Sequence, residues 1–308
     1  MSLGEGEVLA LVGESGSGKS VTGKAILGLL PENARVTSGS IRYRGMNILG
    51  LSEEKISEIR GRKISVVPQD PFLSLDPITR VGVQIAETIP GFPGGGRVKR
   101  EEIRTEAIRL MREVGIRDPE LRYNNYPFEL SGGQRQRIAI AAALAPSPEI
   151  LICDEPTTAL DVTIEAQILD LFLRLRDERR LSMIFITHDL GVVARVADRV
   201  AVMYAGKIVE VGGVEEIFYN PKHPYTVALL SSLPSSGKGR LKPIPGSVPD
   251  MRHPPRGDAF AERNEEALRI DYHIEPPFFD VSETHKVASW SYYKEMRDKE
   301  IGKNEQDA

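Results

Sequence analysis

A glycine-rich segment near the start of the chain, set between an apolar run and a helical pattern, constrains the fold more than any other feature. Residues Gly13 to Ser20 read GESGSGKS and fit G-x-x-x-x-G-K-[ST], and residues 7–12 before them read as a buried strand. In such a loop, successive backbone N–H groups bind phosphate oxygens, and the helix that follows adds positive potential. The lysine reaches the β- and γ-phosphates, and the last hydroxyl binds Mg²⁺.

These roles make the loop a candidate site for a nucleoside triphosphate and Mg²⁺. The residues expected to bind the nucleotide are Gly13, Ser15, Gly16, Ser17, Gly18, Lys19 and Ser20, and Ser20 is also expected to bind the metal. The alternative is a glycine-rich turn with an exposed lysine. That reading is disfavoured because strand, loop and helix come in the order that the motif requires.

The rest of the chain alternates short apolar runs with helical patterns. Strands are predicted at residues 40–43, 63–67, 150–153 and 183–186, and helices at 21–30, 97–114, 134–145 and 164–180. This alternation predicts an α/β fold with a mostly parallel sheet. Around residues 231–255 the composition shifts to Pro, Ser and Gly, which is typical of a linker or an extended segment.

The amino-acid composition excludes or disfavours several classes of protein. The 308 residues include 40 Lys and Arg against 44 Asp and Glu, a net charge of −4, whereas a nucleic-acid binder usually carries a basic excess. Cys153 is the single cysteine, which excludes an internal disulfide and a cluster held by several thiolates. The longest apolar stretch, residues 138–145, is far shorter than the ~20 residues that a membrane helix needs.

Two acids follow a buried strand further along the chain. Asp154 and Glu155 come directly after the apolar residues 150–153, at the strand end where α/β sheets bind ligands. We expect Asp154 to hold Mg²⁺ through water and Glu155 to polarise an attacking water. Taken alone, the pair is equally compatible with ordinary acids at the end of a strand.

A third segment, residues 130–134, reads LSGGQ and precedes a predicted helix, where its serine could simply cap the helix. This segment resembles the signature of the nucleotide-binding subunits of ABC transporters. The other motifs of that family appear in the family's order. They include Gln69 in a Q-loop, residues 158–161 (TALD) as a D-loop, and His188 after a strand. Without the resemblance, a buried structural role would be the better interpretation of His188.

The resemblance implies a P-loop NTPase cassette that binds ATP and Mg²⁺ and works as a dimer, with two ATP molecules between two subunits. Glu155, His188 and Gln69 would be catalytic, and Gln69 would also contact Mg²⁺ together with Ser20 and Asp154. The signature and D-loop residues would contact the nucleotide that the partner subunit holds; they are Ser131, Gly132, Gly133, Gln134 and Asp161.

The same resemblance implies a set of partners. They are a second ABC ATPase subunit (a sister subunit or another copy), two transmembrane permease subunits and, indirectly, a substrate-binding protein. No nucleic acid is expected. The subunit would be cytoplasmic and peripheral on the inner face of the cell membrane.

Two further segments indicate a branch of the family. Residues 69–77 (QDPFLSLDP) are similar to the Q-loop of oligopeptide and dipeptide importers, and residues 220–230 resemble the segment after their cassette. The resemblance implies an ATPase subunit that powers peptide import. Oligosaccharide import and nickel import are alternatives, because an ATPase subunit does not bind the transported substrate and its sequence therefore does not identify that substrate. A soluble DNA-repair ABC ATPase fits less well, since residues 70–129 contain no sustained heptads.

The C-terminal segment follows a frame of the same branch without its cysteines. The four cysteine positions hold Asp258, Asn264, Asp271 and Ser289, which are poor ligands for an iron–sulfur cluster, so we expect no cluster. A zinc or hard-cation site that uses Asp258, Asp271 and nearby histidines is one alternative. Solvated surface acids are another.

We expect an ABC nucleotide-binding domain over residues 1–235, with a helical subdomain over about 76–145, and a C-terminal extension over 236–308 with a disordered tail. The family also implies antiparallel strands and an adenine-stacking aromatic residue before the phosphate loop. Only twelve residues precede Gly13, and none is aromatic. We therefore expect these N-terminal strands to be truncated. Because stacking on an aromatic residue contributes ~1–3 kcal/mol per base, we also expect ATP affinity to fall by roughly tenfold or more.

Overall fold

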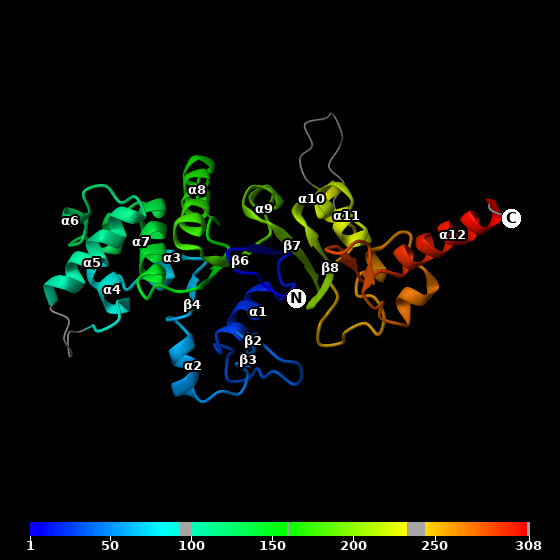
Figure 1. Cartoon of the computed structure of the whole chain (residues 1–308), viewed down its shortest axis with the longest axis horizontal. Helices are drawn as coiled ribbons and strands as arrows, with labels where there is room; N and C mark the ends of the chain where they lie inside the picture. Colours follow the sequence, from blue (N-terminus) through cyan, green and yellow to red (C-terminus); the bar gives the residue numbers. More distant parts are fainter. Residues whose placement is uncertain (93–99, 159, 233–243, 307–308) are drawn as a thin grey trace. The chain divides into compact units, whose positions relative to one another are not determined.

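The computed structural model of the chain describes residues 1–92, 100–158, 160–232 and 244–306. The chain divides into two compact units, and Figure 1 draws its helices and strands with their labels. The first unit consists of Met1, Leu9–Lys19 and Thr187–Ala308, and the second of Ser2–Val8 and Ser20–Ile186. Helix α1 (Lys19–Ile26) begins at the last two residues of the phosphate-loop motif.

The second unit contains the parallel strands β4 (Ile64–Val67), β5 (Ile150–Asp154) and β6 (Ser182–Thr187). Strand β5 pairs on both sides, and Cys153 lies opposite Val67 and Phe185. Its uninterrupted apolar residues suit a strand that is covered on both faces. Parallel pairing brings the carboxyl ends of these strands to one edge, where Asp154 lies opposite Ile186.

Three helices in the second unit pack against one another. Helices α4 (Val81–Thr88), α5 (Arg100–Glu113) and α7 (Gly132–Leu144) contact one another. The apolar stripe of α5 is buried, as its 3.6-residue period predicts. The other elements of this unit are β2 (Arg42–Tyr43), β3 (Met46–Asn47), α2 (Glu53–Ile59), α3 (Pro71–Ser74), α6 (Pro119–Arg122), η1 (Pro127–Glu129) and α8 (Val162–Arg179).

The first unit is built on strand β1 (Val8–Val12), which pairs in parallel with β7 (Arg199–Tyr204). Strand β8 (Lys207–Gly213) returns antiparallel to β7, and β10 (Lys286–Val287) and β9 (Phe279–Asp280) extend the sheet antiparallel. Its helices are α9 (Leu190–Val196), α10 (Val214–Tyr219), α11 (Pro224–Ser231), η2 (Ala261–Arg263), η3 (Arg269–Tyr272) and α12 (Trp290–Gln306).

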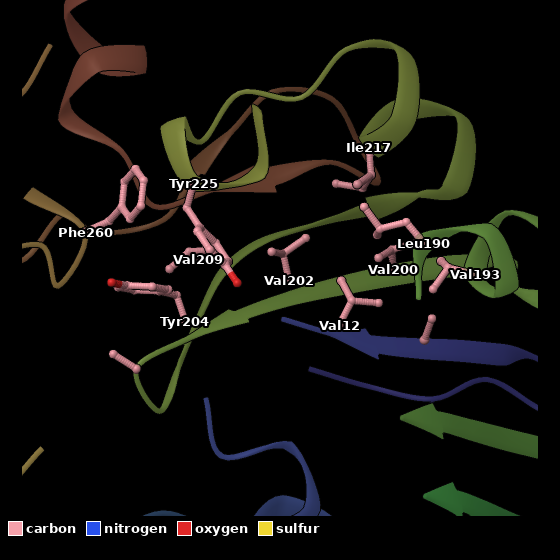
Figure 2. Packing of buried hydrophobic residues seen from close by; sticks show 12 residues of the cluster. Val12, Leu190, Val193, Val200, Val202, Tyr204, Val209, Ile217, Tyr225 and Phe260 are labelled. Carbon is pink, nitrogen blue, oxygen red and sulfur yellow. The ribbon is translucent and has the colours of Figure 1, made fainter. Parts of the chain in front are cut away.

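The core of the first unit joins β1 to residues from the C-terminal segment. Val12, Val200 and Val202 from β1 and β7 are fully buried in this cluster. At one end, Tyr204, Tyr225 and Phe260 pack together with ring centroids 4.5–5.4 Å apart (Figure 2). Aromatic side chains bury large apolar areas, so these three rings bind the residues around 260 firmly to the end of β7, the strand that pairs with β1.

Parts of the C-terminal segment differ from the sequence-based expectation. Where a disordered tail was expected, helix α12 runs from Trp290 to Gln306, and the rings of Trp290 and Tyr293 pack on Phe279. Asp258 and Asp271 are buried rather than solvated surface acids, with exposed fractions of 7% and 2%. Of the predicted linker at 231–255, residues 233–243 lie outside the described residues.

Candidate active site

The phosphate loop is shaped by steric demands on its glycines. Gly13 has φ +155°, and a Cβ there would lie 2.0 Å from the carbonyl oxygen of Met203, so no larger residue fits against β7. Gly16 and Gly18 have φ of +79° and +103°, which side-chain-bearing residues rarely adopt. The loop therefore needs glycine at all three positions for its backbone path.

Two polar groups of the loop are buried in a way that suits an anion. Lys19 is only 4% exposed, and its Nζ donates to the carbonyl oxygens of Gly13 at 2.8 Å and Glu14 at 2.9 Å. The hydroxyl of Ser17 is buried and has no hydrogen-bond partner in the described part of the chain. Because a buried hydroxyl without a partner is unfavourable, a phosphate oxygen at this position would satisfy it.

In the second unit, the loop's last residue meets the acid of β5. Ser20 Oγ donates to Asp154 Oδ1 at 2.9 Å. Both side chains supply hard oxygen atoms of the kind that Mg²⁺ prefers, and these atoms lie side by side. The pair therefore suits one Mg²⁺, with Asp154 expected to act through water.

The next residue, Glu155, is held in an unusual conformation. It has φ +45°, in the left-handed region that non-glycine residues rarely occupy. Its N–H donates to Ile186 O at 2.8 Å, which fixes the backbone at the edge of the sheet. Its Oε2 accepts from Gln69 Nε2 at 3.0 Å and from Thr158 Oγ1 at 3.1 Å. Such backbone strain clusters at functional sites.

The predicted signature segment forms the start of helix α7. Ser131 Oγ accepts from Gln134 N at 3.3 Å, and Gln134 Oε1 accepts from Ser131 N at 3.0 Å, a reciprocal capping box. Ser131 and Gly132 are exposed. At Gly133, a Cβ would lie 2.5 Å from Ile164 Cγ2, so glycine permits close packing of α7 on α8. The exposed helix N-terminus can donate hydrogen bonds to an anion.

Two further predicted site residues lie at element ends. Asp161 caps helix α8, with Oδ1 accepting from Ile164 N at 3.0 Å, and within its D-loop Ala159 lies outside the described residues. His188 follows β6 and is exposed rather than buried in a core. The neighbouring Asp189 caps α9 by accepting from Gly191 N and Val192 N. His188 thus lies at the surface in the short connection between β6 and α9.

The structure brings some of the predicted residues together. Ser20 contacts Asp154 and Gln69 contacts Glu155, all in the second unit. Lys19 and the rest of the phosphate loop belong to the first unit, as does His188. Sequence reasoning missed the residues that hold the loop from the C-terminal segment, although an acid inside a phosphate loop was a signal for a cationic partner.

A phosphate loop before a helix, an oxygen-donor pair for Mg²⁺ and a capped LSGGQ helix start define a nucleotide-binding cassette. Residues 1–158 match the family model described as ABC transporter, and residues 209–270 match one described as oligopeptide/dipeptide transporter, C-terminal region. The chain belongs to the ABC transporter family, in the branch of oligopeptide and dipeptide transport ATP-binding proteins, and it is an ABC-type ATPase.

Curated relatives are similar over most of the chain. The dipeptide transport ATP-binding protein DppD of Lactococcus lactis subsp. cremoris is 54% identical over 94% of this chain and 82% of its own length. The oligopeptide transport ATP-binding proteins AmiE of Streptococcus pneumoniae and OppD of Bacillus subtilis are 55% and 53% identical, over 96% and 94% of this chain and 83% and 81% of their own lengths.

Solved structures of cassettes resemble the chain as well. The bacterial ABC transporter cassette MJ0796, solved as a dimer, matches with a TM-score of 0.61 and 30% identity over 70% of this chain and 88% of its own. A post-hydrolysis dimer of the same cassette, bound to ADP and Pi, matches with a TM-score of 0.61 and 29% identity over the same shares. These matches confirm the predicted fold class.

Two structural findings bear on other expectations. In the described part of the chain, no helix is both long and apolar enough to cross a bilayer. Across the described residues, no group of three or more His, Cys, Asp or Glu side chains could hold a metal ion.

Proposed function

We propose that this chain is the ATP-hydrolysing subunit that powers import of oligopeptides or dipeptides through a membrane ABC transporter. The observation that carries the proposal is the pair of contacts at the end of β5. There Ser20 meets Asp154, and Gln69 meets Glu155. Identity above 50% to peptide-transport ATP-binding proteins supports the choice of cargo class.

Each site residue has a role that its position suits. The N–H groups of the phosphate loop and Lys19 bind the β- and γ-phosphates. Ser20, Asp154 and Gln69 would hold Mg²⁺, which neutralises charge on the phosphates when bound. Glu155 orients water for attack on the γ-phosphorus, which breaks its bond to the β–γ bridging oxygen and releases ADP and phosphate. His188 donates a hydrogen bond to the γ-phosphate.

We assign the remaining residues to a dimer of cassettes. The exposed N-terminus of α7, with Ser131, Gly132, Gly133 and Gln134, contacts the nucleotide of a partner ATPase subunit, and Asp161 lies beside it in the dimer. The partner is a sister subunit or a second copy. The dimer drives two transmembrane permease subunits from the inner face of the cell membrane, and a substrate-binding protein delivers the cargo.

The domain assignment belongs to the same proposal. Residues 1–235 serve as the nucleotide-binding domain, and their helical subdomain over about 76–145 carries the docking site for the permease subunits. Residues 236–308 form the C-terminal extension.

A Glu155→Gln variant tests the catalytic assignment. The amide keeps the shape of the side chain but cannot serve as the base for the attacking water, so ATP binding persists and steady-state hydrolysis falls at least ~100-fold. Lys19→Ala is the contrasting variant, because it removes a phosphate ligand and weakens binding itself. Hydrolysis by Glu155→Gln at the parent rate would refute the assignment.

Uptake by the source cell tests the cargo. Deletion of the gene should abolish uptake of labelled short peptides while uptake of oligosaccharides and Ni²⁺ continues. Intact peptide uptake with loss of sugar or nickel uptake would keep the ATPase role and overturn peptide import.

A further inference from the structure

An acidic residue inside the phosphate loop presents an electrostatic problem. Glu14 is the second residue of the loop, and its charge would repel a polyphosphate bound to the same backbone. Its carbonyl oxygen nevertheless shapes the loop, because it accepts from Lys19 Nζ at 2.9 Å and from Ser17 N at 3.2 Å. Whatever holds Glu14 therefore also sets the position of Lys19.

Arg263 from the C-terminal segment binds the Glu14 carboxylate through two hydrogen bonds. Its Nη1 donates to Glu14 Oε2 at 2.6 Å, and its Nη2 donates to Glu14 Oε1 at 3.1 Å. The Arg263 side chain is 5% exposed and that of Glu14 is 27% exposed, so solvent screens this pair little. A two-bond fork of this kind fixes orientation as well as charge.

Arg263 is itself fixed by further contacts. Its Nε donates to Pro245 O at 2.7 Å, and its Nη1 also donates to Tyr204 Oη at 3.1 Å. The guanidinium lies 5.6 Å from the centre of the Tyr204 ring and 5.8 Å from that of Phe260. Because burial lowers side-chain freedom and every contact is local to the first unit, the cation has one favoured position next to the loop.

A second contact reaches the same loop residue from α11. Tyr225 is fully buried, and its Oη accepts from the backbone N–H of Glu14 at 2.8 Å. Tyr225 also packs against Tyr204 and Phe260 (Figure 2), and the Arg263 guanidinium lies over these same two rings. The side chain and the backbone of Glu14 are therefore both held by residues after 220.

We propose that Arg263, assisted by Tyr225, is a positioning residue for ATP binding, which neutralises Glu14 and holds the Glu14 carbonyl where it orients Lys19. The C-terminal segment thereby becomes part of the nucleotide site without touching the nucleotide. The inference rests on the proposed role of residues 13–20 as the nucleotide loop.

The test measures the dissociation constant of mant-ATP with Mg²⁺ by fluorescence, on the full chain. Arg263→Gln leaves the Glu14 carboxylate without its cation, so the Kd should rise at least about fivefold. Adding Glu14→Gln removes the uncompensated charge, so the double variant should recover most of the lost affinity. A role confined to folding would not be relieved by this second change.

Matched variants separate the possible outcomes. Arg252→Gln removes an exposed arginine from the same segment, where it pairs with Asp250, and should leave the Kd unchanged. Arg263→Lys keeps the positive charge but cannot make the two parallel hydrogen bonds to Glu14, so it should weaken binding less than Arg263→Gln does. If Arg263→Gln does not fold, Arg263→Lys takes its place in the comparison with and without Glu14→Gln. The proposal is overturned if Arg263→Gln binds mant-ATP as tightly as the parent does. It is also overturned if adding Glu14→Gln to Arg263→Gln restores none of the lost affinity.

Lys19→Ala distinguishes failure of this inference from failure of the proposed function. If Lys19→Ala binds mant-ATP as tightly as the parent does, residues 13–20 are not the nucleotide loop, and both the proposed function and the role of Arg263 are refuted. If Lys19→Ala loses binding while Arg263→Gln keeps it, the loop assignment stands and the role of Arg263 is refuted.

Discussion

Replacing Gly133 with alanine tests how closely α7 packs on α8 at the signature segment. A Cβ at this position would lie 2.5 Å from Ile164 Cγ2. Carbon atoms in contact prefer about 3.5–4.0 Å, so the two helix starts must separate by about 1 Å or more. Overpacking of this kind costs about 1–3 kcal/mol. Alanine's better helix propensity recovers at most about 1 kcal/mol of that cost.

The assay is equilibrium unfolding in urea followed by far-ultraviolet circular dichroism. The two terms leave a net loss of up to about 2 kcal/mol, and each 1 kcal/mol lost lowers the unfolding midpoint by roughly 0.3–1 M at ordinary urea m-values. Gly132→Ala is the matched control, because the nearest atom to its Cβ would be Leu160 Cδ2 at an ordinary 3.8 Å. Because alanine brings the same helix propensity here without the clash, its midpoint should lie at or above that of the parent.

A second substitution identifies the source of the strain. Ile164→Ala removes the clashing methyl group, so the double variant with Gly133→Ala should be more stable than the sum of the two single effects predicts. If Gly133→Ala unfolds at the same midpoint as Gly132→Ala, close approach of the helices does not explain this glycine. If the two effects simply add, the strain lies elsewhere.

Two further predictions concern stability and reactivity. The Glu113 carboxylate accepts hydrogen bonds from Arg179 at 2.6 and 2.7 Å. Burial alone would raise the pKa of Glu113, but the positive charges of Arg179 and Arg109 outweigh burial, so its pKa is lowered. Glu113→Gln should therefore destabilise by about 1–3 kcal/mol at pH 7, and the deficit should shrink at acidic pH as the carboxyl of Glu113 in the folded parent, whose pKa is lowered, becomes protonated. Urea unfolding from pH 7 to 3 measures this, and a deficit independent of pH would contradict it. Cys153 is fully buried, and burial raises the pKa of its thiol, so a thiol reagent such as DTNB should react only after unfolding. Stoichiometric labelling of the native protein would contradict that burial.

The sequence alone predicted the elements that carry local signals. The glycine pattern of the phosphate loop predicted both its backbone path and the helix after it, because glycine conformations and helix starts are local properties. Apolar periodicity predicted the strands before Asp154 and His188 and the buried stripe of α5. The order of these motifs along the chain was enough to predict the family and its ATPase chemistry.

Only the tertiary structure decided the partners that are distant in sequence. The contact between Gln69 and Glu155 depends on parallel strands whose register no local pattern specifies. The pairing of Glu14 with Arg263 joins residues 249 positions apart, and it exists because the aromatic cluster around Tyr204 brings the C-terminal segment to the loop. Neither contact can be predicted from local propensity, because both depend on the packing of side chains against elements that are distant in the sequence.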